Sequence, residues 1–145
     1  MKKDRKNIIL ESLAAMLEEK NMSKITTASL AEKSNITEAA LYRHFPSKRS
    51  IYAELFSFCD DTIFAKCNEL KKEKISAQEK VKKIFIFFML FIGKNKGFAR
   101  LLSREALSSD EQNVSESVNQ FYERFELVIR PVSYTHLTLP TRLMV

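Results

Sequence analysis

Apolar residues recur at every third or fourth position along most of the chain, and this spacing places them on one face of an α-helix. The stripe predicted over about residues 7–20 consists of Ile9, Leu10, Leu13, Met16 and Leu17. Similar stripes predict helices over about 48–74, 77–94, 98–107 and 114–130. The chain has only two glycines and three prolines, so it carries few β-turn signals. We therefore predict an all-α fold.

The stretch from Ile25 to Ser50 interrupts these long stripes and predicts two short helices joined by a tight turn. Thr26 and Thr27 precede the first of them, and either hydroxyl can cap it. A turn of this kind needs one residue at positive φ. Asn35 is the best candidate, because the stretch contains no glycine.

The second short helix begins after Thr37 and extends over about residues 38–45. Pro46 ends it, because a proline disfavours helical geometry at the residue before it. Ser47 then caps the next helix. Outward or rim residues around this break can donate hydrogen bonds or carry positive charge, which suits a phosphate backbone. These residues are Tyr42, Arg43, His44, Lys48 and Arg49.

The same residues carry a family resemblance. The segment ALYRHFPSK, preceded by ITTASLAEKSNIT, resembles the helix-turn-helix of TetR-type bacterial transcription factors, which implies a three-helix head on a helical body. With ILESLAAMLE and VNQFYERFE, the chain is more narrowly similar to the nucleoid occlusion factors of this family, which bind chromosomal DNA and antagonise the division protein FtsZ. A structural hairpin in an unrelated all-α protein is the alternative, and the combined motif spacing disfavours it.

The resemblance implies a set of DNA-binding residues. Tyr42, His44 and Lys48 would hold phosphates, and Thr26 or Thr27 would anchor the first short helix. The residues that would approach bases are Thr37, Glu38, Ala39 and Arg43. Arg43 is the preferred base reader, because a guanidinium can bridge the two acceptors of guanine; its alternative is one more phosphate contact.

Residues 1–7 form a basic arm that includes Lys3 and Arg5. Beside a helix-turn-helix, such an arm either contacts phosphates and the minor groove or is an ordinary solvated terminus. One recognition helix reads only a few base pairs. We therefore expect the intact protein to bind a palindromic double-stranded DNA site as a homodimer.

The resemblance to nucleoid occlusion factors implies a groove for the C-terminal tail of FtsZ. Its residues in this chain are Phe58, Lys66, Phe87, Leu90, Lys94 and Asn95. Such a groove binds a peptide through apolar anchors with basic residues at the rim. Gly93 stands where the family carries an acidic residue, and Lys66 and Lys94 stand for arginines, which weakens bidentate recognition of a carboxylate. Phe87 and Leu90 could instead be ordinary core residues.

The helix over 77–94 contains an unbroken apolar run from Ile84 to Ile92. A membrane-spanning helix needs about 20 such residues, so this run is too short to cross a bilayer. We predict a fully buried central helix and no membrane insertion. An interfacial membrane helix, flanked by Lys80, Lys82 and Lys83, is the alternative.

The 145 residues are 45% hydrophobic and carry a formal net charge of +6, which suits a modest globular protein with an anionic partner such as nucleic acid. Cys59 and Cys67 lie too far apart on one predicted helix to pair within it. With no export-signal pattern at the N-terminus, we expect a cytoplasmic, nucleoid-associated protein. The two histidines, His44 and His136, complete no metal site or catalytic set, so we expect no enzyme activity, cofactor or metal.

The last residues break with the preceding pattern. Pro131 is predicted to end the last helix, and no helical period follows it. The segment VSYTHLTLPT resembles the translation of a transposon-end sequencing adapter, so we interpret residues 132–145 as non-native; a divergent natural terminus is the alternative. The predicted domains are 1–50 for DNA binding and 51–131 for a partial partner-binding body, without the C-terminal dimerisation helices of the family.

Two functional hypotheses follow. The preferred one is a sequence-specific DNA-binding nucleoid occlusion factor that inhibits FtsZ-dependent septum assembly over the chromosome. The alternative is a ligand-responsive TetR-type repressor, in which a small molecule enters the helical body and changes the spacing of two heads. Both use the same DNA-binding residues and differ in their partner.

Overall fold

The computed structural model describes residues 4–19 and 25–136, and these residues form helices and their connections, with no strand among them. The elements in chain order are α1 (Arg5–Glu18), α2 (Thr27–Lys33), α3 (Glu38–His44), α4 (Lys48–Lys71), α5 (Ala77–Lys94), α6 (Lys96–Leu102), the short 3-10 helix η1 (Ser109–Glu111) and α7 (Gln112–His136). The all-α prediction is confirmed.

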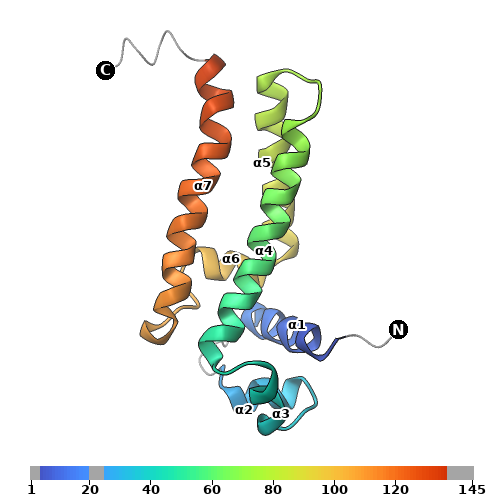
Figure 1. Cartoon of the computed structure of the whole chain (residues 1–145), viewed down its shortest axis with the longest axis vertical. Coiled ribbons are helices and arrows are strands. Elements are labelled where there is room, and N and C mark those ends of the chain that lie inside the picture. Colours follow the sequence, from blue (N-terminus) through green and yellow to red (C-terminus); the bar gives the residue numbers. More distant parts are fainter. Residues whose placement is uncertain (1–3, 20–24, 137–145) are drawn as a thin grey trace.

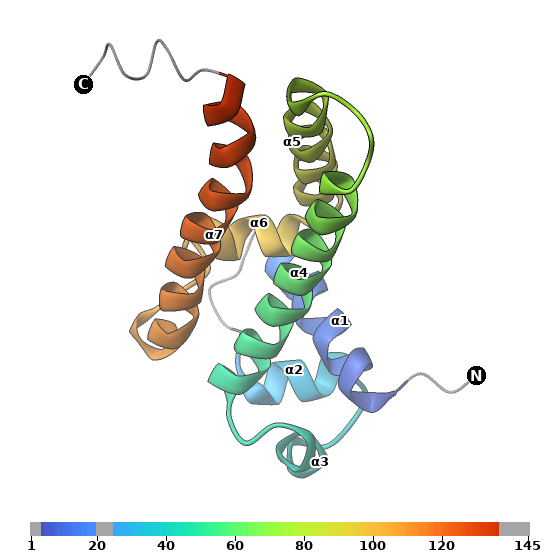
Figure 2. The same cartoon turned by 45° about the horizontal axis from the view of Figure 1, so that its top comes forward.

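The helices form a head and an elongated body (Figure 1). α1, α2 and α3 make the head at one end of the molecule, and α4 leads from it along the body. The 24 residues of α4 span about 36 Å, which is enough to join the head to the far end. α5 and α7 extend beside α4, and α6 lies across the body near the head. Figure 2 shows α3 at the outer end of the head, beyond α2.

Hydroxyl side chains start the two short head helices and α4. Each accepts a hydrogen bond from the backbone N–H three residues further on, at 3.0–3.2 Å, and the three residues are Thr26, Thr37 and Ser47. Asn35, in the turn between α2 and α3, has a φ of 56°. The predicted turn residue and the predicted caps are therefore confirmed, with Thr26 rather than Thr27 as the cap of α2.

α3 has only two turns, so it depends on the core that it helps to form. Leu41 and Phe45 are buried together with Leu13 of α1 and Leu30 of α2. Burial of one such side chain contributes about 1.5–3 kcal/mol. These core contacts hold α3 in place and leave its opposite face exposed.

The body is organised around Phe121 of α7. Its ring packs against rings from three other helices, with centroid distances of 5.4–6.3 Å, and those rings belong to Phe56, Phe64, Phe88 and Phe98. The predicted stripe of α7 is buried here, including Val114, Val118 and Phe125. These aromatic contacts fasten α4, α5, α6 and α7 into one core.

α6 also joins the body to the head through α1. Gly97 lies so close to α1 that a Cβ atom at this position would be 2.7 Å from the Ala14 carbonyl oxygen. Arg100 donates from Nη1 to the carbonyl oxygens of Leu17, at 3.1 Å, and Glu19, at 2.8 Å. A guanidinium at the end of a helix satisfies its last carbonyls and suits the helix dipole. Arg100 therefore caps the C-terminal end of α1.

The prediction that the apolar run of α5 is fully buried is wrong. Ile84 is completely buried, but several large apolar side chains of the same helix are 44–60% exposed, namely Phe85, Ile86, Met89 and Leu90. The sequence reports that these residues are apolar, whereas their burial depends on which helices lie against them. Among the described residues, the neighbours of α5 cover one side of it. No helix in this part of the chain is long and apolar enough to span a bilayer.

The prediction that Pro131 ends the last helix is also wrong, because α7 continues to His136. Proline removes one backbone donor, but its own φ is compatible with a helix, so helical residues can follow it. The predicted non-native segment therefore begins inside α7. Its remaining residues, 137–145, lie outside the described part of the chain.

Candidate nucleic-acid interface

The outward face of α3 lies at the end of the head that is remote from the body (Figure 2). Tyr42 is 49% exposed, Arg43 is exposed and His44 is half-buried. Arg43 and His44 belong to the last turn of α3, while the buried Leu41 and Phe45 belong to the core. The head thus presents hydrogen-bond donors and positive charge on a helix whose position its core contacts fix.

A hydrogen-bond network joins α2 to α3 at this face. The Thr27 hydroxyl donates to Glu38 Oε1 at 2.8 Å, and the Tyr42 hydroxyl donates to Thr27 Oγ1 at 3.3 Å. Three residues that were predicted to contact DNA therefore contact one another. The network holds the Tyr42 ring beside the start of α2. It also directs the Glu38 carboxylate, which would repel a phosphate, toward α2.

The other predicted contacts of the head are also accessible. Thr26, Thr37 and Ala39 are exposed at the starts of α2 and α3. Arg5 is exposed at the first position of α1. Lys3 lies outside the described residues. Accessible candidate residues thus come from all three helices of the head.

Lys48, the first residue of α4, has a partner in the body. Its Nζ lies 3.3 Å from Glu111 Oε1 and 5.6 Å from the centre of the Tyr52 ring. Glu111 is only 1% exposed, and Tyr52 is 2% exposed. The adjacent Arg49 donates from Nε to Asn113 Oδ1 at 3.4 Å. The start of α4 is therefore joined at two points to η1 and the start of α7.

The surroundings of Glu111 favour its charged form. Burial alone would raise the pKa of Glu111, but hydrogen bonds from the Ser108 hydroxyl and the Ser108 N–H, together with the charge of Lys48, outweigh burial and lower this pKa. Burial and, next, the negative charge of Glu111 raise the pKa of Tyr52. The junction is thus a buried carboxylate with one ammonium as its counterion.

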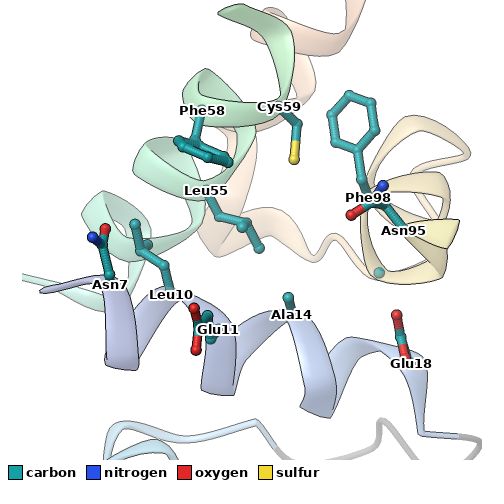
Figure 3. A pocket seen from close by; sticks show the side chains of 11 residues that line it. Asn7, Leu10, Glu11, Ala14, Glu18, Leu55, Phe58, Cys59, Asn95 and Phe98 are labelled. Atoms are coloured by element: carbon teal, nitrogen blue, oxygen red, sulfur yellow. The ribbon is translucent and has the colours of Figure 1, made fainter. Parts of the chain in front are cut away.

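A pocket of about 280 Å³ lies between α1, the middle of α4 and the start of α6 (Figure 3). It is lined by Asn7, Leu10, Glu11, Ala14, Glu18, Leu55, Phe58, Cys59, Asn95, Gly97 and Phe98. Figure 3 shows Phe58 and Leu55 of α4 above Leu10 of α1, with Asn95 on the α6 side. The pocket therefore brings together two residues that were predicted to bind a partner, Phe58 and Asn95.

The other four predicted partner residues do not line this pocket. Lys66 forms an ion pair with Glu69 at 3.5 Å, Leu90 is 60% exposed and Lys94 is exposed. Phe87 is half-buried. The expected basic rim is thus absent from the pocket itself, whose charged lining residues are carboxylates of α1.

Sequence reasoning missed the contribution of α1 to the pocket and the role of Glu111 at the head–body junction. Leu10 belonged to a predicted core stripe, and nothing local distinguished its position at a pocket. Glu111 lies between the helices predicted over 98–107 and 114–130, where no apolar stripe predicted structure. Gly97 is the one lining residue whose type carries a signal that could have been used, since a glycine permits close packing.

Two thiols lie within the body. Burial, followed by the nearby charge of Asp60, raises the pKa of Cys59 to about 12. Burial also raises the pKa of Cys67. Both side chains are unpaired and buried. A raised pKa favours the protonated thiol at neutral pH, so both thiols are weak nucleophiles where they lie.

Comparison with known proteins agrees with this architecture. Residues 9–55 match the family described as "Bacterial regulatory proteins, tetR family". The chain is 34% identical over 132 residues to the nucleoid occlusion factor SlmA of Vibrio vulnificus, covering 90% of this chain and 67% of that protein. It is 33% identical over 129 residues to SlmA of Marinobacter nauticus, covering 89% of this chain and 66% of that protein. The chain thus spans about two thirds of the length of these relatives.

A solved structure from Clostridium perfringens, described as a fatty acid metabolism regulator, superposes with a TM-score of 0.72. The match covers 89% of this chain and 71% of the other, at 18% identity, and so supports the fold alone. The identity to several SlmA proteins extends well beyond the head. The chain therefore belongs to the TetR family of bacterial regulatory proteins and is related to the nucleoid occlusion factors named SlmA.

Proposed function

We propose that the chain binds double-stranded DNA through the outward face of α3 and, in its full-length homodimeric form, acts as a nucleoid occlusion factor that restrains FtsZ-dependent septum assembly over the chromosome. The observation that carries the DNA-binding part is the exposed Tyr42–Arg43–His44 face on a helix anchored by Leu41 and Phe45. The relatives named as nucleoid occlusion factors support the biological role.

In this proposal different residues of the α3 face contact the phosphates and the bases of DNA. Tyr42 and His44 hold phosphates, and Arg43 in the last turn of α3 reaches for a base edge. Thr26, Thr37, Glu38 and Ala39 lie at the helix starts beside them. The domain assignment of 1–50 as the DNA-binding part and 51–131 as the partner-binding part belongs to the same proposal, as does residence in the cytoplasm on the nucleoid.

The first test is a titration of a fluorescent DNA duplex at low ionic strength. Arg43→Ala should weaken binding by about 5- to 150-fold, because a guanidinium contact to a base is worth about 1–3 kcal/mol. Lys72→Ala is the matched control, since it removes an exposed cation at the opposite end of α4. It should change the dissociation constant less than about twofold. Equal losses for both variants would mean that the protein attracts DNA by its net charge alone.

The partner part of the proposal places an apolar side chain of the FtsZ tail against Phe58 and Asn95 in the pocket of Figure 3. A synthetic peptide of that tail should lose binding to Phe58→Ala. Phe85→Ala is the control, because Phe85 is an exposed phenylalanine of α5 outside the pocket. If small apolar molecules, rather than the peptide, occupied the pocket and released DNA, the ligand-responsive repressor would be the better description.

A further inference from the structure

Glu111 is a buried carboxylate that the DNA-binding proposal does not use. It lies in η1, between α6 and α7, and is 1% exposed. One of its oxygens accepts hydrogen bonds from the hydroxyl and the N–H of Ser108, the latter at 2.9 Å. Its other oxygen lies 3.3 Å from Lys48 Nζ. The carboxylate therefore has a complete set of partners, and Lys48 is its only cation within ion-pair distance among the described residues.

Lys48 stands at the border between the head and the body. It is the first residue of α4, three residues after Phe45 at the end of α3, yet its ammonium lies against Glu111 and the Tyr52 ring of the body. Figure 1 shows the start of α7 beside the first turns of α4. The ion pair joins Glu111, at the end of η1, to the first residue of α4. About one third of the Lys48 side chain, 34%, remains exposed. A phosphate at this end of the head would thus compete with Glu111 for one ammonium.

That competition is unequal. A phosphate in water can exchange Lys48 for counterions, whereas Glu111 would become an uncompensated buried charge if Lys48 left it. The nearby carboxylate also neutralises much of the positive charge of Lys48, so the ion pair presents little net charge to a duplex. A lysine held in this way displaces fewer counterions from DNA than a lysine free to reach a phosphate.

We propose that Glu111 sets the DNA affinity of the head by retaining Lys48, so that Lys48 contributes fully to phosphate binding only when Glu111 is neutral or withdrawn. Glu111 is then a positioning residue that acts through Lys48. The inference rests on the proposed DNA-binding function. It also predicts how the body can influence the head, because η1 belongs to the body and continues directly into α7.

The decisive variant is Glu111→Gln, which keeps the size of the side chain and its acceptor for the Ser108 N–H. The measurement is the dissociation constant for a fluorescent duplex at several salt concentrations. We expect Glu111→Gln to bind about 3- to 10-fold more tightly at low salt. The slope of log K against log salt should steepen by about 0.9, which corresponds to one additional phosphate contact.

Two further variants separate this effect from a general change in charge. Glu116→Gln removes one negative charge from the exposed surface of α7 and should leave the slope unchanged. Adding Lys48→Gln to Glu111→Gln should abolish the gain. An unchanged or shallower slope in Glu111→Gln with an intact helical spectrum, or a gain that survives Lys48→Gln, would overturn the proposal.

If Glu111→Gln does not fold, Lys48→Gln with an intact helical spectrum decides the question. A retained lysine predicts a change in slope much smaller than 0.9, and a full change of 0.9 contradicts the proposal. If the wild-type chain fails to bind any duplex, the proposed function fails instead. In that case the rate of lysine acetylation, measured by mass spectrometry, tests the ion pair directly. Relative to Lys66, Lys48 should be acetylated faster in Glu111→Gln than in the wild type. Equal relative rates in the two proteins would show that Glu111 does not retain Lys48.

Discussion

Gly97 is the point at which α6 comes closest to α1. A Cβ atom there would lie 2.7 Å from the Ala14 carbonyl oxygen and 3.2 Å from Leu17 Cβ. The first contact is with backbone, which cannot move aside without shifting α1. The missing side chain therefore sets the distance between a helix of the head and a helix of the body, and it shapes one wall of the pocket in Figure 3.

We predict that Gly97→Ala lowers the free energy of unfolding by about 1–3 kcal/mol, the usual cost of overpacking. Gly93→Ala is the matched control, because a Cβ atom at Gly93 would meet nothing within 4 Å. It lies inside α5, so alanine there should stabilise the protein by about 0.5–1 kcal/mol. Urea unfolding followed by circular dichroism distinguishes the two. Destabilisation of similar size by both substitutions would show that packing against α1 is not the cause.

Single residues were predictable where their partner lies close in sequence. The caps Thr26, Thr37 and Ser47 bond to backbone three residues away, and Asn35 meets a local need for positive φ. Arg100 caps α1 from far along the chain, and no local pattern indicates such a bond. Lys48 and Glu111 are likewise far apart in the sequence, so their pairing could not be predicted either.

α5 shows why an apolar helix need not be a buried one. Its apolar run is wider than the side that faces α4 and α7, so Ile84 is fully buried while Ile86, two residues further on, is 50% exposed. Successive side chains of a helix point about 100° apart, and a run without polar residues carries no information on which of them faces a neighbour. The amphipathic stripe of α7, in contrast, predicted its buried face correctly.

We predict that Ile84→Ala costs about 2–4 kcal/mol of unfolding free energy, through lost burial and the cavity left behind. Ile86→Ala removes the same atoms from a half-exposed position and should cost less than about 1 kcal/mol. The difference between the urea unfolding midpoints of the two variants measures how much more deeply Ile84 is buried than Ile86. Equal costs would mean that the exposed side of α5 is covered in solution.

For the molecule as a whole, the junction between head and body depends on a charged Glu111. Its pKa is lower in the folded state than the ordinary value of 4.5. The stability that this shift contributes is therefore present above about pH 4.5 and is lost as the pH falls through the lower folded-state pKa. The division into a head and a body followed from the motifs, but the groups that join them lie on segments too distant to be paired from sequence.

We predict that the wild type loses stability below about pH 4.5 more steeply than Glu111→Gln, which has no carboxylate to protonate at this site. The stability gap between the two proteins should shrink from pH 7 toward pH 3. Thermal unfolding across this range provides the measurement, and Glu116→Gln, an exposed substitution on α7, should follow the wild-type curve. A gap that stays constant with pH would show that the charge of Glu111 does not stabilise the junction.

The reactivity of Cys59 and Cys67 reports local opening of the body. Both are enclosed and protonated at neutral pH, so an alkylating reagent reacts with them only after a helix has swung outward. The rate of alkylation then measures how often the helices open. Because Cys59 borders the pocket and Cys67 does not, an occupant of the pocket slows one thiol selectively and thereby reveals its presence without a label of its own.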